Sequence, residues 1–362
     1  MDKISSNLLY YRGRVGLREI LIGLELQPGD IVATQAFTCS AVPEAILAAE
    51  CRPLYIDLED GGVNLCPDNL EARLSSDVKC IVVQHTFGIP AQIDRIVSIA
   101  AHRDIPIVED CCHTLDSKLN SQVVGSFGKA AFYSHEWGKP IVCGVGGSLR
   151  INDENLKVKL LSRYQKFNEP GMKRSIRLRA QFAAFSLLYR PEFYWPIKRA
   201  FHALSRKGVA EGNYNDLGSE PSPEFGLRMP KTCRARLKSK LKNLVNTTQH
   251  SRQIAEIYAE SLNSHSMHSV IQPQGAETTF SRFPLWTNDK QGIIGKAQRE
   301  NIEVADWYAT PIHPFTGNDL ASIGYTFGSC PNAEAACERI VSLPVHAKTS
   351  IKQAKKIASL LH

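Results

Sequence analysis

The sequence predicts an α/β protein built on a mostly parallel sheet, and three observations support this fold class. In the first 150 residues, short runs rich in Val, Ile and Ala alternate with longer stretches of helical periodicity. Several of the short runs are apolar throughout, as expected for strands covered on both faces. Hydrophobic residues make up 43% of the chain and charged residues 22%, the range of a folded protein. At 362 residues, two domains are expected.

The expected elements follow in order along the chain. Strands are predicted at Ile31–Thr34, Leu54–Leu58, Cys80–Gln84, Pro106–Val108, Ala130–Tyr133 and Ser148–Ile151. The helices between them are predicted at Val15–Leu26, Ala41–Glu50, Pro67–Leu74 and Ile93–His102. Farther along, helical patterns cover Asp153–Phe167, Cys233–Leu262 and Ile351–Leu361, the last with Ser350 as its N-cap. Residues 208–227 have the composition of a loop.

The residues that follow the strands are the first candidates for a site. Ligands of parallel α/β sheets bind at the carboxyl ends of the strands. This rule selects His85, Glu109, Asp110, Ser134 and the glycine cluster Gly144–Gly147.

The positive charge is concentrated in one segment. The net charge is +7, but Lys157 to Lys240 holds 19 basic and 6 acidic side chains, so the rest of the chain is negative. One interpretation, which we favour, is an outer helical layer with its aromatic residues inward and its cations in solvent. The other is a surface for a phosphate-rich partner, above all a membrane surface contacted through residues 177–207. Nucleic acid is not expected, because no nucleic-acid-binding motif accompanies the charge.

Location and redox state follow from what the sequence lacks. No apolar run approaches the roughly 20 residues that a spanning helix needs. Met1–Ser6 does not have the cationic-then-apolar layout of a secretory leader. The ten cysteines include no CxxC pair, so buried thiols are expected and a metal site is not. We therefore expect a cytoplasmic protein.

Two residues could carry chemistry, although each has an ordinary explanation when taken alone. Asp110 ends an apolar strand, where a carboxylate is costly to bury unless it meets a cation. It could equally cap the segment that follows. Lys139 lies between the strand end at Tyr133 and the glycine cluster, and it could be a surface lysine.

A series of motifs, in the same order over about 320 residues, resembles the DegT/DnrJ-type nucleotide-sugar aminotransferases. The matching segments are Pro28–Asp30, Arg52–Asp57, His85–Ala91 with Asp94, Val108–His113, Val124–Gly128, Ser134–Lys139 with Gly146-Gly147, Trp307–His313, Cys330–Glu334 and Ser342–His346. The resemblance implies the fold-type I scaffold of aspartate aminotransferase, with a mostly parallel sheet of the seven-stranded type. It also implies a large domain over residues 1–243, which includes the basic helical segment 155–243, and a small α/β domain over 244–362. A homodimer is expected as well.

The resemblance also implies roles for individual residues around pyridoxal 5'-phosphate. Lys139 would bind the cofactor aldehyde covalently and shuttle the proton. Asp110 would pair with the pyridine nitrogen and keep the ring an electron sink. His113 would contact the side of the ring that carries the phenolic oxygen, and Ser134 would donate to the phosphate.

Three positions depart from the family pattern. The first helix begins with Arg12-Gly13-Arg14 where the family has Ser-Gly-Thr, so Gly13 and Arg14 are expected to contact the phosphate. Cys39 takes the place of an aromatic residue that stacks on the ring. Gly226 stands where a partner-subunit asparagine would be.

The function that follows is the transamination of a keto-sugar nucleotide with glutamate as amino donor. Its product would enter surface polysaccharide synthesis, such as that of lipopolysaccharide O-antigen. Tyr308 and His313 are the expected substrate contacts. Two alternatives remain open. One is a related sugar dehydratase, which carries His in place of the lysine, and His135 lies nearby. The other is a non-catalytic regulatory descendant, suggested by the departures at Arg12, Arg14 and Gly226.

Overall fold

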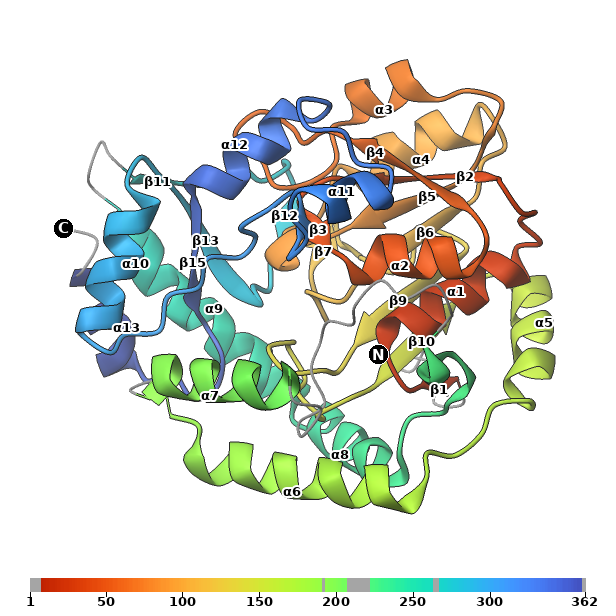
Figure 1. The fold of residues 1–362 in the computed structure, drawn as a ribbon. Helices are drawn as coiled ribbons and strands as arrows, with labels where there is room; N and C mark the ends of the chain where they lie inside the picture. The colour runs from red at the N-terminus through yellow and green to blue at the C-terminus, as the bar shows by residue number, and fades with distance from the viewer. Residues whose placement is uncertain (1–7, 191–192, 207–221, 263–266, 360–362) are drawn as a thin grey trace.

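The computed structural model describes residues 8–190, 193–206, 222–262 and 267–359, and a seven-stranded sheet forms its centre (Figure 1). The strands lie in the order β1-β10-β9-β6-β5-β2-β4. Their bounds are β1 Leu9–Tyr10, β10 Gly147–Ile151, β9 Ala130–Ser134, β6 Ile107–Asp110, β5 Val78–Gln84, β2 Ile31–Gln35 and β4 Arg52–Ile56. In the described part of the chain, only β10 runs against its neighbours in this sheet. The predicted mostly parallel sheet is confirmed.

Helices cover both faces of this sheet, which explains why its strands are continuously apolar. Within β5, Cys80 and Val82 pack in one core with α1 (Gly13–Gly23), α2 (Ala41–Ala48) and α5 (Glu154–Tyr164). The alternate residues Ile81 and Val83 pack in another core with α3 (Pro67–Arg73) and α4 (Ile93–Ala101). Alternate side chains of a strand point to opposite faces, so both sets must be apolar.

The topology brings three strand ends and one helix start to the same edge of the sheet. Strand β6 lies between β5 and β9, and Asp110 is in register with Gln84 on one side and Phe132 on the other. Helix α1 begins at Gly13, and a Cβ atom on that glycine would lie 3.4 Å from the Ser134 Cβ. Gly13 therefore lets the start of α1 approach the end of β9 closely.

A second, smaller sheet lies toward the C-terminus (Figure 1). It contains β11 (Met267–Ser269), β13 (Arg282–Thr287) and β15 (Ile340–Pro344), all antiparallel. It shares a core with α9 (Leu244–Glu260), α10 (Lys290–Arg299) and α13 (Ile351–Ala358). Ser350 caps α13 in a reciprocal arrangement with Gln353, as predicted.

Short elements join the two regions. Strand β14 (Ile312–His313) pairs in parallel with β3 (Thr38–Cys39), so the chain after Trp307 lies beside the start of α2. A further small sheet combines β12 (Ala276–Glu277), β7 (Lys118–Leu119) and β8 (Gln122–Val123). Other short elements are α11 (Asn318–Ser322), α12 (Pro331–Arg339) and the single turns η1 (Thr86–Gly88) and η3 (Pro223–Gly226).

The prediction of one helix over Cys233–Leu262 is wrong in detail. The structure contains two helices there, α8 (Lys231–Leu241) and α9, and Asn243 between them leaves the helical conformation. Asn competes for backbone hydrogen bonds and is common at helix ends. The domain boundary predicted at residue 243 falls at this break and remains a prediction.

Two helices of the basic segment, α6 (Met172–Leu188) and α7 (Tyr194–Arg206), run along one side of the molecule (Figure 1). Their aromatic residues point inward, as predicted. The Phe185 ring lies 4.8 Å from that of Trp137, and the buried Trp195 indole donates to the Ile302 carbonyl. Of the predicted loop 208–227, residues 208–221 lie outside the described residues. None of the described helices combines the length and apolar character needed to cross a membrane.

Candidate active site

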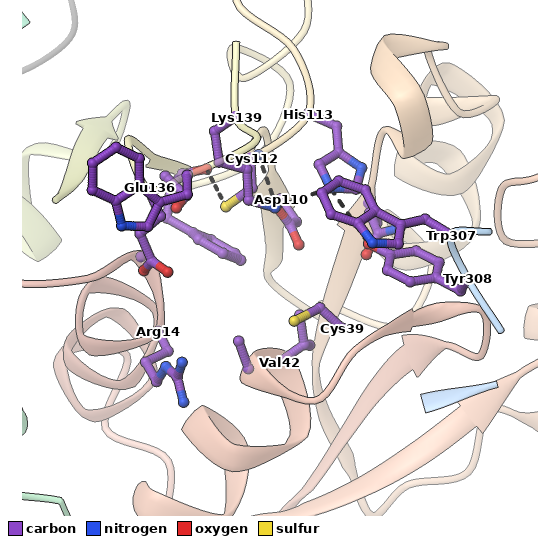
Figure 2. A pocket seen from close by; sticks show the side chains of 16 residues that line it. Arg14, Cys39, Val42, Asp110, Cys112, His113, Glu136, Lys139, Trp307 and Tyr308 are labelled. Carbon is purple, nitrogen blue, oxygen red and sulfur yellow. Dashed lines mark hydrogen bonds between the residues drawn. The ribbon is translucent and has the colours of Figure 1, made fainter. Parts of the chain in front are cut away.

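A pocket at the carboxyl ends of β5, β6 and β9 brings the predicted site residues together (Figure 2). Its lining includes all seven predicted catalytic and cofactor-binding residues: Gly13, Arg14, Cys39, Asp110, His113, Ser134 and Lys139. Tyr308 also lines it. His313 is not among the lining residues, because it lies one strand farther out, in β14 and in register with Cys39. The roles of these residues remain predictions.

Asp110 presents a buried carboxyl group to the floor of this pocket. Its side chain is 4% exposed, and Oδ1 accepts a hydrogen bond of 2.9 Å from the Cys112 backbone N–H. Burial raises the pKa of Asp110, although the Cys112 bonds and the nearby Lys139 charge act in the opposite direction. A carboxylate in this position is best stabilised by a cationic group inside the pocket.

Lys139 and His113 meet on the opposite side of the pocket from Cys39 (Figure 2). The Lys139 Nζ atom lies 3.0 Å from His113 Nε2, and Tyr308 Oη lies 3.4 Å from the same nitrogen. The Phe87 backbone N–H donates to His113 Nδ1 over 3.3 Å. Burial, with the Lys139 charge, holds the pKa of His113 well below its ordinary value, so the ring is neutral at physiological pH.

A network of buried charges surrounds the start of α1, at the other end of the pocket. Arg12 donates to Glu136 over 2.8 Å and to Glu224 over 2.7 Å. Arg14 forms an ion pair with Glu44 and a longer one, at 3.5 Å, with Glu224. These two cations therefore face three carboxylates. Glu136 and Arg14 both line the pocket on the same side (Figure 2).

The sequence did not lead us to expect the three carboxylates Glu44, Glu136 and Glu224 at the site. Glu136 lies inside the Ser134–Lys139 motif, so its position in that motif was a usable signal. Glu44 and Glu224 are 30 and 212 residues from their arginine partners in the chain, and no local pattern links them.

An aromatic wall closes the side of the pocket opposite Arg14 (Figure 2). Trp307 and Tyr308 follow α10 and lie beside His113, whose ring stacks on that of Tyr308 at 6.1 Å. Trp137 lines the pocket from the lysine loop. Trp307 and Trp137 were not predicted to line the site, although both belong to the motifs quoted above.

Two neighbouring histidines do not belong to this pocket. His135 is fully buried, and its Nε2 lies 2.8 Å from the Ser148 hydroxyl, while burial lowers the pKa of His135 to about 4. His85 lies 3.1 Å from Glu109, whose oxygens also accept from the backbone N–H groups of Gly125, Phe127 and Gly128. This carboxylate is saturated with donors, so Glu109 and His85 have a structural role.

Comparisons with known proteins agree with this geometry. A 3-aminotransferase acting on UDP-N-acetyl-3-dehydro-alpha-D-glucosamine, from Acidithiobacillus ferrooxidans, is 24% identical over 96% of this chain and 81% of its own. A pleiotropic regulatory protein from Geobacillus stearothermophilus is 26% identical over 88% of this chain and 74% of its own. The sugar aminotransferase Spr1654 from Streptococcus pneumoniae, solved in its PLP form, superposes with a TM-score of 0.76 at 18% identity, covering 97% of this chain and 85% of its own.

The family comparison covers almost the whole chain. The family model of the DegT/DnrJ/EryC1/StrS aminotransferases matches residues 13–362, which include every residue of the pocket described above. The chain is an aminotransferase and belongs to the DegT/DnrJ/EryC1/StrS family.

Proposed function

We propose that this protein transfers the amino group of glutamate to a keto-sugar nucleotide, with pyridoxal 5'-phosphate held in the pocket described above. The observation that carries the proposal is the convergence of Lys139, Asp110 and His113 in one pocket at the strand ends. An amine and a buried carboxyl group are the side chains that this chemistry requires, and the neutral His113 imidazole lies beside the amine.

The donor set fits the ring of the cofactor. The buried Asp110 carboxylate suits the protonated pyridine nitrogen, which would supply the missing cation. Lys139 Nζ suits the aldehyde. At the phosphate end, Ser134 and the first turn of α1 offer donors, and Gly13 leaves space that a side chain would fill. Glu136 is the exception, because its carboxylate lies at the end of the pocket where the phosphate would bind.

When bound, the cofactor would supply an electron sink for the carbanion formed at the substrate carbon. Residues of the chain would carry out the proton transfers and orient the reacting groups. Lys139 Nζ would take the proton from the carbon of the amino donor, as general base, and in the second half of the reaction would give a proton to the sugar carbon, as general acid. Asp110 would hold the ring nitrogen protonated, and His113 with Tyr308 would orient the amine. The aromatic wall, with Tyr308 buried and Trp307 half-buried, would exclude water from the reacting atoms.

The substrate class and assembly belong to this proposal. A relative that covers nearly the whole chain is a UDP-sugar aminotransferase, which supports a keto-sugar nucleotide. A spore coat polysaccharide biosynthesis protein from Bacillus subtilis, 30% identical over 37% of this chain and 35% of its own, supports a role in surface polysaccharide.

We further propose a cytoplasmic homodimer, which sedimentation velocity would test; a stable and active monomer would contradict it.

The decisive experiment is spectroscopic. Purified protein loaded with pyridoxal phosphate should lose its visible absorbance on addition of glutamate and regain it when a matching keto-sugar nucleotide is added. A panel of UDP-, GDP- and TDP-linked keto sugars identifies the acceptor. The proposal would be overturned if the protein bound no pyridoxal phosphate. It would also be overturned if the absorbance spectrum of the loaded protein did not change with any amino donor.

A further inference from the structure

Helix α6 has an apolar outer face that the described residues of the chain leave exposed. Met172, Ile176 and Leu187 are 78%, 58% and 76% exposed. Their spacing of four and eleven residues places them on one side of the helix. Ala180 and Ala183 are exposed on the same side. We call this set of residues the α6 stripe: Met172, Ile176, Ala180, Ala183 and Leu187.

The opposite side of α6 is also apolar and is already used for packing. Leu178 is buried there, and Phe182 and Phe185 contact Trp137, with ring centroids 5.9 Å and 4.8 Å away. Within the described part of the chain, only this inner side of α6 is covered. A contiguous row of exposed apolar side chains marks an interaction site, so the α6 stripe implies a partner.

The charges around the α6 stripe identify the chemistry of that partner. Lys173 and Arg179 are exposed on α6, and Arg190, just after α6, and Arg199, on α7, are exposed as well. Neither helix contains an acidic residue. Cationic side chains therefore flank exposed aliphatic ones on a single surface, the composition of helices that lie in a membrane interface.

We propose that the α6 stripe docks on an anionic lipid surface. Its aliphatic side chains would enter the boundary between headgroups and acyl chains, and the flanking cations would meet lipid phosphates. A second copy of the chain fits this face less well. In a two-fold contact centred on α6 the stripe would meet its own copy, so the flanking cations would face like charges.

Docking would also hold the pocket close to the lipid surface. The α6 aromatic residues touch Trp137, which lines the pocket, so only one layer of side chains separates the inner face of α6 from the site. The proposal rests on the surface alone and does not depend on transamination.

Co-sedimentation of the protein with lipid vesicles tests whether the α6 stripe docks on an anionic lipid surface. The wild type should bind vesicles rich in phosphatidylglycerol, bind phosphatidylcholine vesicles weakly or not at all, and be released by high salt. A triple variant, Met172→Gln, Ile176→Gln and Leu187→Gln, should lose binding about tenfold or more. A charge variant, Lys173→Gln with Arg179→Gln, should lose a similar factor.

Matched controls lie on other surfaces. Phe327→Gln with Ile271→Gln removes exposed apolar side chains elsewhere, and Lys352→Gln with Lys356→Gln removes two exposed cations from α13. Both controls should bind vesicles like the wild type. Hydrogen exchange of the wild type provides a measurement without any substitution, because residues 172–188 should become protected only with anionic vesicles.

Three outcomes would overturn the proposal. The first is equal binding to neutral and anionic vesicles, or to neither. The second is equal loss of binding in the controls and the α6 variants. The third is sedimentation showing that the triple variant dissociates an oligomer, since the α6 stripe would then be an interface between copies of this chain.

Discussion

The Lys139 amine lies 3.0 Å from Nε2 of His113, and the backbone decides which atom donates. The Phe87 N–H is a fixed donor to His113 Nδ1, so Nδ1 carries no proton in the neutral ring. The ring proton is then on Nε2, which points at Lys139 Nζ and Tyr308 Oη. Lys139 can accept a hydrogen bond from this Nε2–H only as the neutral amine, which is the form that acts as nucleophile or general base.

Substitution of the lysine is the first test of this arrangement. Lys139→Ala should retain its fold and bind pyridoxal phosphate non-covalently, but turnover should be lost because both the covalent anchor and the proton shuttle are gone. Absorbance of the loaded protein and single-turnover kinetics measure these effects. Lys79→Ala, at an exposed lysine, is the control. A Lys139→Ala protein that transaminates at the wild-type rate would contradict the assignment.

Asp110 should control the rate of proton abstraction. Asp110→Asn removes the charge that would hold the ring nitrogen protonated, so the rate should fall by about 10²–10⁴-fold while the covalent link to Lys139 is kept. Stopped-flow absorbance with glutamate measures the step directly. An unchanged rate, with normal cofactor spectra, would remove Asp110 from the mechanism.

Asp110 should also destabilise the folded protein when no cofactor is bound. Burial raises the pKa of Asp110, so as pH rises the unfolded chain ionises first and the folded state loses relative stability up to the raised pKa. Without cofactor, Asp110→Asn should be more stable than wild type by about 1 kcal/mol at neutral pH. The difference should vanish in acid. Urea denaturation across pH tests this, and a variant that is less stable at every pH would be the contrary result.

Glu136 should weaken the binding of the cofactor's phosphate. Its carboxylate lines the pocket beside Arg14 and would face an anion there. Glu136→Gln should lower the Kd for pyridoxal phosphate by about fivefold, the effect of roughly 1 kcal/mol of relieved repulsion. The Kd for pyridoxal, which has no phosphate, should not change. Glu154→Gln, on the exposed start of α5, is the matched control. Equal effects on both ligands would show that Glu136 does not act through the phosphate.

A buried charge cluster should govern stability in acid. Glu303 pairs with Arg282 at 3.0 Å and with His346 at 3.0 Å, and it accepts from Tyr189 Oη at 2.7 Å. Burial alone would raise its pKa, but His346, Arg282 and Tyr189 together lower the pKa of Glu303 to about 2. The stability that it contributes is therefore present above its ordinary pKa and lost as pH falls toward 2.

Glu303→Gln should lower the free energy of unfolding by about 3 kcal/mol at neutral pH, because Arg282 would remain buried without its partner. The gap between variant and wild type should narrow in acid. Glu277→Gln, which breaks a surface pair with Lys118, should change stability by less than about 1 kcal/mol. A pH-independent loss in Glu303→Gln would mean that packing, and not charge, is responsible.

Much of the fold could be predicted because its signals are local. Strands β2, β5 and β9 lie within two residues of their predicted bounds, since a strand covered on both faces must be a short apolar run. The break between α8 and α9 could not be predicted in the same way, because helical periodicity continues through it. The local conformation of Asn243 decides that break.

In the candidate site too, some features have local sequence signals and others do not. Asp110, His113 and Lys139 could be selected from motif order, and the end of a buried strand explains why Asp110 faces a pocket. The sequence by itself determined which chemical groups are present and that β6 carries a carboxylate to its carboxyl end.

Tertiary structure alone decided which charges meet at the other end of the pocket and which face of α6 is uncovered. Arg12 pairs with Glu224, which is 212 residues away in the chain, and Arg14 pairs with Glu44, which is 30 residues away. The packing of α1 on the sheet brings these partners together. The inner face of α6 is distinguished from its outer face by contact with Trp137 and by the burial of Leu178. Both faces are apolar in sequence, so periodicity could not choose between them; only packing against the rest of the chain determines which face is buried.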